Sequence, residues 1–106
     1  MSLDVELIYK KEVVFEYNIT HNLTNMARYA GLYYCLWRPE EYNCFKARDI
    51  INPLSCGLAI LKDNPEKFKT HNAENGCGTY ENLIEFVEAY LTKCKEYPNA
   101  KIKVDR

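Results

Sequence analysis

Two short polar segments carry the residues of this chain that could do chemistry. The first, Asn18–Asn22, surrounds His21 with side chains able to orient an imidazole, and the second, Asn75–Glu81, contains two glycines and a threonine. Each precedes a stretch with helical spacing, and the first turn of a helix presents unpaired N–H groups that favour an anionic or carbonyl-rich guest. The candidate ligand-binding residues are therefore Asn18, His21, Asn22, Asn75, Gly76, Tyr80 and Glu81.

One interpretation of these segments is catalytic. A helix start disfavours a protonated histidine, so His21 suits the role of general base. Glu81 would orient it or supply a proton, and the amides of residues 76–79 would bind the anionic, nucleotide-like substrate of a hydrolase or transferase. Cys77 could also be a nucleophile, or could share a metal ion with His21 and His71. The spacing of these residues is diagnostic of neither role, so neither a metal nor a cofactor is expected. In the simplest interpretation, these residues only cap helices.

Aromatic residues are concentrated between Tyr29 and Tyr42. Neighbouring aromatic residues on one helix cannot all face the core, so some should be exposed or line a groove. Exposed tyrosine and tryptophan often mark protein interfaces. Tyr33, Trp37 and Arg38 are therefore candidate interface residues for a protein partner.

Composition excludes several classes of function. The net charge is −1, from 14 basic and 15 acidic residues, which makes nucleic acid an unlikely partner because phosphate backbones need clustered positive charge. No apolar run is long enough to span a bilayer, and no signal peptide is recognisable. The 5 cysteines include no C-x-x-C pair, which favours free thiols in a cytoplasmic protein.

Period-two alternation from Leu3 to Ile19 predicts a hairpin with one buried face. Its turn lacks an Asn-Gly or Asp-Gly signal. Residues 100–104 alternate as a final strand. The chain is therefore expected to form a single α+β domain over residues 1–106, with the order β-β-α-α-α-β and a three-stranded sheet packed on one face by about three helices. The residues expected on the buried face of the hairpin are Leu3, Val5, Leu7, Tyr9, Val13, Phe15, Tyr17 and Ile19.

Helical spacing begins after Thr20 or Asn22 and reaches Trp37, with Gly31 as an interruption. A second stripe runs from Ile50 to Leu61, where Asn52-Pro53 indicates either a fresh helix start or a kink. A short helix follows Asn64-Pro65, and residues 69–78 form a loop. Thr79 then caps the clearest helix, which we expect to be the most buried element, with Phe86, Val87, Tyr90 and Leu91 toward the sheet.

Three segments together resemble a family of small bacteriophage and prophage proteins without an assigned activity. They are Asn18–Asn22, Gly31–Glu41 and Asn75–Glu81, so the resemblance spans most of the chain. Family members tend to carry tryptophan where this chain has Cys77, which further weakens the thiol-enzyme interpretation. The resemblance implies an intracellular, phage-related accessory role and supplies no mechanism.

We therefore expect a binding or regulatory module that recognises a protein or a polar or anionic small ligand. A small hydrolase or transferase with His21 as general base is the alternative, and a purely structural subunit is a third. Geometry separates them, because an enzyme needs His21 and Glu81 to converge in one pocket, whereas an interaction module can use an exposed aromatic patch.

Overall fold

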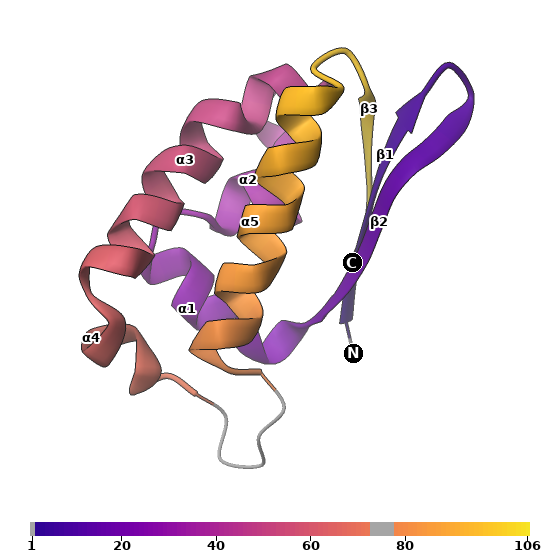
Figure 1. The fold of residues 1–106 in the computed structure, drawn as a ribbon. Helices are drawn as coiled ribbons and strands as arrows, with labels where there is room; N and C mark the ends of the chain where they lie inside the picture. The colour runs from indigo at the N-terminus through magenta and orange to yellow at the C-terminus, as the bar shows by residue number, and fades with distance from the viewer. Residues whose placement is uncertain (1, 73–77) are drawn as a thin grey trace.

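The computed structural model describes residues 2–72 and 78–106. Three antiparallel strands form a sheet in the order β2-β1-β3, and the helices pack on one of its faces (Figure 1). The strands are β1, Ser2–Tyr9; β2, Glu12–Thr20; and β3, Lys101–Asp105. This architecture confirms the α+β fold predicted from hydrophobic periodicity, including a sheet built from an N-terminal hairpin and a C-terminal strand.

The hairpin closes through Lys10 and Lys11, whose φ angles are 51° and 67°. A two-residue turn with both residues left-handed matches the twist of the flanking strands. The pairing register between β1 and β2 shifts near this turn: Leu7 pairs with Phe15, whereas Ile8 pairs with Val13. The expectation that Val13 faces the core is wrong: it is 52% exposed. This shift is a β-bulge, which inserts one extra residue into β2. Val13 therefore no longer lies on the strand face that buries Ile19.

Short helices connect the hairpin to two long ones. Gly31, with φ +75°, separates α1 from α2, as the sequence predicted. The helical elements are η1, His21–Leu23; α1, Thr24–Tyr29; α2, Tyr33–Trp37; η2, Pro39–Tyr42; α3, Ala47–Asp63; α4, Pro65–Lys69; and α5, Tyr80–Glu96. None of the helices in the described ranges is long and apolar enough to cross a membrane.

Helix α3 continues through Pro53, so Asn52-Pro53 does not start a new helix. Proline has no N–H, which leaves the carbonyl of Asp49 without its usual helical donor. The thiol of Cys44 lies 3.8 Å from that carbonyl oxygen and 3.6 Å from the carbonyl oxygen of Tyr42, and its single hydrogen can be donated to only one of them. Four residues later, Gly57 faces Leu32, whose side chain occupies the space that a Cβ would need. The contact between Gly57 and Leu32 brings the start of α2 close to α3.

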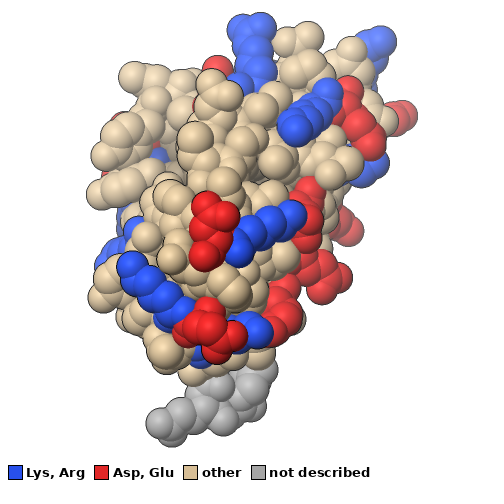
Figure 2. Space-filling model, turned by 60° about the vertical axis from the view of Figure 1, so that its left-hand side comes forward, with Lys and Arg blue, Asp and Glu red and all other residues tan. Residues whose placement is uncertain are grey.

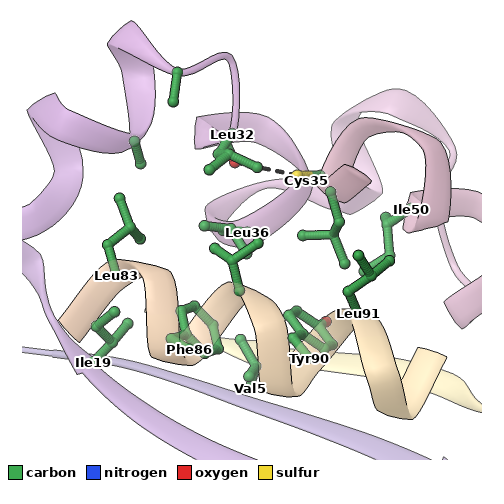
Figure 3. Packing of buried hydrophobic residues seen from close by; sticks show 14 of the residues in the cluster. Val5, Ile19, Leu32, Cys35, Leu36, Ile50, Leu83, Phe86, Tyr90 and Leu91 are labelled. Carbon is green, nitrogen blue, oxygen red and sulfur yellow. Dashed lines mark hydrogen bonds between the residues drawn. The ribbon is translucent and has the colours of Figure 1, made fainter. Parts of the chain in front are cut away.

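Helix α5 lies between the sheet and the other helices. The Phe86 ring lies 4.9 Å from the Tyr17 ring, and the Tyr90 ring lies 5.3 Å from the Phe15 ring. Leu91 instead lies beside Ile50 on the side of α5 that faces the helices (Figure 3), so its expected contact with the sheet is not made. Two apolar sides of one helix therefore join the two layers.

Truncating Phe86 should test this packing. Phe86 has no exposed surface, so Phe86→Ala is expected to lower the free energy of unfolding by roughly 3–5 kcal/mol. Ile60→Ala, at a site that is 42% exposed, is the control and should change it by less than about 0.5 kcal/mol. Equal urea midpoints for Phe86→Ala and the control would contradict the packing.

Three polar groups are enclosed in the same core. Burial raises the pKa of the Cys35 thiol from 9.0 to about 12, with a smaller contribution from Cys44. Burial also raises the pKa of the Cys94 thiol from 9.0 to about 12 and that of the Tyr90 hydroxyl well above 10.0. All three groups are therefore neutral in the folded protein at neutral pH.

These shifts predict alkaline unfolding. Above pH 9 the unfolded thiols lose protons that the folded ones keep until about pH 12. The unfolded state binds fewer protons in that window, so stability falls as pH rises, by up to about 4 kcal/mol for each thiol. Urea denaturation of Cys94→Ala should show a shallower decline with pH than the parent protein, whereas the exposed Cys56→Ala should not. A decline identical in both variants would refute the assignment.

Candidate functional site

The end of β2 positions His21 where the sheet meets the helices. Thr20 accepts a hydrogen bond from the Asn22 amide at 3.2 Å, and the Thr24 hydroxyl donates to the His21 carbonyl at 2.6 Å. These local bonds hold the η1 turn in place. The imidazole of His21 consequently lies edge-on to the indole of Trp37, with 6.2 Å between ring centroids.

Trp37 is the only tryptophan of the chain and is 3% exposed. Tyr33 precedes it by one helical turn in α2, so the two rings share a face. They stack with an interplanar angle of 12° and a centroid distance of 5.8 Å. Trp37 therefore packs in the core, and Tyr33 extends the aromatic stack toward the surface.

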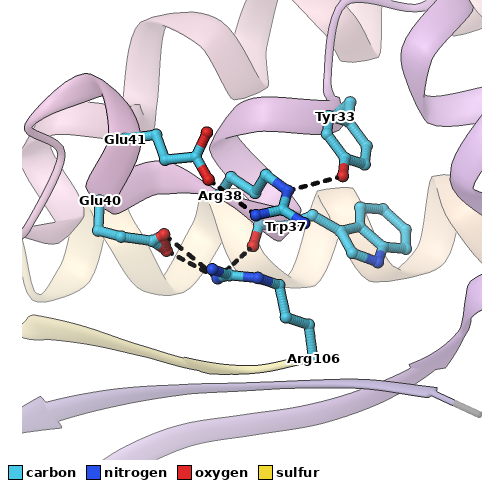
Figure 4. Close-up of polar contacts among 6 residues, drawn as sticks. All are labelled: Tyr33, Trp37, Arg38, Glu40, Glu41 and Arg106. Carbon is cyan, nitrogen blue, oxygen red and sulfur yellow. Dashed lines mark hydrogen bonds and ion pairs between the residues drawn. The ribbon is translucent and has the colours of Figure 1, made fainter.

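Two guanidinium groups flank Tyr33. Arg28 lies over the ring, with its Cζ 4.3 Å from the centroid, and Arg38 donates from Nε to the Tyr33 hydroxyl at 2.9 Å. Figure 4 shows Arg38 held between Tyr33 and Glu41, with Arg106 close to the Trp37 carbonyl. We call the set of His21, Arg28, Tyr33, Trp37 and Arg38 the aromatic–arginine cluster.

The arginines set the electrostatics of this cluster. The hydrogen bond from Arg38, followed by that from Arg28, lowers the pKa of the Tyr33 hydroxyl. Arg38 pairs with Glu41 at 2.8 Å, and Arg106 pairs with Glu40 at 2.9 Å. Arg28 has no carboxylate within ion-pair distance in the described part of the chain. The outer side of the cluster is consequently basic, with one guanidinium charge not neutralised by a carboxylate.

The inner side contains polar atoms without partners. His21 Nε2 and Trp37 Nε1 are enclosed, and neither makes a hydrogen bond within the described structure. Leaving a buried donor or acceptor unpaired costs about 1–3 kcal/mol. Because such atoms are few in folded proteins, a neighbouring pair marks a site that is not optimised for packing alone.

The other candidate residues of the first polar segment lie elsewhere. Asn18 donates to Ser2 at 2.9 Å and to Asp4 at 2.7 Å, so it belongs to the sheet face that the helices leave uncovered. Asn22 lies against Gly78, where a Cβ would be 3.2 Å from that of Asn22. Gly78 has φ +110°. The two polar segments therefore meet at this glycine.

Tyr80 and Glu81 face a different hollow. The Tyr80 hydroxyl donates to the Leu61 carbonyl at 2.7 Å, and Glu81 pairs with Lys69 at 3.7 Å. Both line a hollow of about 300 Å³ with Ile84 and other α5 residues. Figure 2 shows lysine and acidic side chains side by side on this helical face. The structure brings His21 to Trp37, not to Glu81.

The chain's own side chains occupy most of the α5 N-terminus. Thr79 and Asn82 cap each other's amides at 3.1 Å, and Asn72 accepts from the Tyr80 amide at 2.7 Å. These bonds leave few of the N–H groups that an anionic guest would need there. Asn75 and Gly76, the remaining candidates, lie outside the described residues.

Arg28 was not among the site residues predicted from the sequence. Its guanidinium reaches Tyr33 only because the Gly31 turn folds α2 back beside α1, so a helical wheel places the two residues apart. An arginine within a few positions of an aromatic run is the signal that could have indicated a cation–π pair. Within residues 2–72 and 78–106, no cluster of histidine, cysteine, aspartate or glutamate is suited to a metal ion.

Comparisons with protein-family models, curated proteins and solved structures gave no match. The geometry of the aromatic–arginine cluster therefore has to support any functional proposal.

Tyr33 should ionise at a lower pH than it would without its arginines. Neighbouring guanidinium groups favour the phenolate, so ultraviolet difference spectroscopy is expected to show an early step among the 9 tyrosines. Tyr33→Phe should remove that step, and Arg38→Gln should move it to higher pH. Tyr29→Phe is the matched control, because Tyr29 stacks on His71 instead. An early step that survives Tyr33→Phe would show that another tyrosine produces it.

Proposed function

We propose that this protein is a binding module that recognises an anionic group through the aromatic–arginine cluster. The group is a carboxylate or phosphate carried by a protein partner or a small polar molecule. The observation that supports this best is the Arg28 guanidinium, which lies 4.3 Å over the Tyr33 ring without a carboxylate partner in the described ranges. A guanidinium forms bidentate, charge-assisted hydrogen bonds with such anions.

Packing beneath the arginines supports the same proposal. Tyr33 stacks on Trp37, and Trp37 is buried in the core. The platform under Arg28 is therefore rigid before any ligand arrives. Binding groups that are already ordered lose less entropy on association, so a rigid platform strengthens recognition.

The resemblance to phage and prophage proteins supports a cytoplasmic accessory role for this module within a bacterial host. The catalytic alternative lacks a specific observation in its favour. Nε2 of His21 is enclosed beside Trp37, and Glu81 pairs with Lys69 in another hollow. A general base needs to reach the proton it removes.

Trp37 fluorescence provides the test. Titration with inorganic phosphate and with a glutamate-rich peptide should shift the emission, because Trp37 stacks directly under Tyr33. Arg28→Gln should weaken binding at least about tenfold, since a hydrogen bond to a charged group contributes about 1.5–3 kcal/mol. Added salt should weaken the parent protein's binding more than that of the variant.

Arg48→Gln is the matched control. Arg48 is exposed near the start of α3, where it lies 3.4 Å from the Asn99 side chain and belongs to no part of the cluster. The Arg48→Gln variant should bind both probes as the parent protein does. Saturable binding that is equal in all three proteins would assign the anion to another site, and absence of binding by both probes would reject the proposal.

A further inference from the structure

Two guanidinium groups of the aromatic–arginine cluster converge on one phenol. Arg28 lies over the face of the Tyr33 ring, with its Cζ 4.3 Å from the centroid. Arg38 approaches the edge of the same ring, where its Nε donates to the hydroxyl at 2.9 Å. The hydrogen bond from Arg38, and after it that from Arg28, lowers the pKa of this hydroxyl, so both guanidinium groups act on the same oxygen. Two like charges are therefore held around a single ring.

Glu41 neutralises only part of this charge. Its Oε2 accepts from one terminal nitrogen of Arg38 at 2.8 Å, and the two side chains are 38% and 46% exposed. Exposed ion pairs of this kind contribute little to stability, because water and salt screen them. Arg28 forms no ion pair with any residue in the ranges 2–72 and 78–106. An external anion that contacts both guanidinium groups can therefore take the place of Glu41.

The third arginine near the cluster is already engaged. Arg106 pairs with Glu40 at 2.9 Å and donates to the Trp37 carbonyl at 3.1 Å (Figure 4). Its guanidinium thus fixes the end of β3 against the residues that follow α2. Arg28 and Arg38 are consequently the two guanidinium groups of this region that a guest can reach.

The structure assigns a doubly charged guest to this arginine pair, a phosphate monoester in preference to a carboxylate. This inference rests on the anion-binding function proposed above and specifies its ligand. A phosphate monoester carries a charge of about −1.5 to −2 at pH 7 and three strong acceptor oxygens. It can therefore contact Arg28 and Arg38 at once. A carboxylate has one charge and two oxygens, which a single guanidinium already satisfies as a bidentate pair.

Isothermal titration calorimetry with phenyl phosphate and phenyl sulfate tests this assignment, because the two esters have similar shapes and differ in charge. Near pH 7.5 the parent protein should bind phenyl phosphate about tenfold more tightly, the effect of one additional charge-assisted hydrogen bond. The preference should disappear toward pH 5, because the phosphate ester becomes a monoanion below its second pKa of about 6. Titration of the protein, His21 included, would act on both esters, so their ratio reports the charge of the ligand.

Substitutions at the arginine pair should change this ratio. Arg28→Gln and Arg38→Gln should each abolish most of the preference for phenyl phosphate, because a single guanidinium remains. Glu41→Gln should strengthen phenyl phosphate binding roughly threefold, since it removes the competing carboxylate. Glu88→Gln is the matched control: Glu88 pairs with Lys62 at 3.0 Å outside the cluster, and its loss changes the net charge equally. That variant should bind as the parent protein does.

The results separate this inference from the function on which it rests. Equal binding of the two esters near pH 7.5 that still depends on Arg28 would overturn the inference and leave anion recognition in place. A preference that survives Arg38→Gln would also overturn it. Absence of saturable binding by either ester would reject the proposed function as well. The pH dependence of the ratio is measured on the parent protein, so it decides the matter even if a variant fails to fold.

Two further probes identify the source of the ester. One is free O-phosphoserine, and the other is a short peptide that contains phosphoserine. Tighter binding of the peptide would assign the phosphate to a modified protein partner, and tighter binding of the free compound would assign it to a small molecule. Both outcomes support a monoester site.

Discussion

Burial of two sides of α5 is the constraint on which the rest of the structure depends. Phe86 and Tyr90 join it to β2, whereas Leu91 joins it to α3. Its start is fixed by the Thr79–Asn82 caps and by Gly78 against η1. Its end continues through residues 97–100 into β3. One amphipathic helix therefore determines both where η1 presents His21 and where β3 enters the sheet.

The aromatic–arginine cluster depends on that packing. Segments as short as α1 and α2 are not stable helices alone, because helix nucleation is unfavourable and a short helix forms too few hydrogen bonds to offset it. Here Leu32, Leu36 and Trp37 anchor α2 in the core. Trp37 then supports Tyr33, and Tyr33 supports the two guanidinium groups. The unpaired nitrogens of His21 and Trp37 lower the stability gained from this arrangement.

The aromatic–arginine cluster and the exposed rings of Tyr34, Tyr42 and Phe45 come from the same stretch of chain, residues 28–45. Gly31 and Pro39 interrupt its helices, so its aromatic rings point in several directions rather than along one stripe. Tyr33 and Trp37 turn toward the arginines and the core, whereas Tyr34 and Tyr42 line a separate hollow beside Pro39 and Pro53. A single long helix would have confined these rings to fewer faces.

The sequence by itself determined the parts that follow from short-range periodicity. Alternation in the hairpin, the α5 stripe, the Thr79 cap and the Gly31 interruption all predict elements found in the structure, because each depends on residues only a few positions apart. Tertiary structure decided the rest. The bulge at residues 13–15 exposed Val13, continuation through Pro53 made one helix of α3, and packing placed His21 beside Trp37 and away from Glu81. The position of Arg28 over Tyr33 arises from the chain reversal at Gly31. Local patterns do not encode such a reversal, because it depends on how whole elements bury their apolar faces.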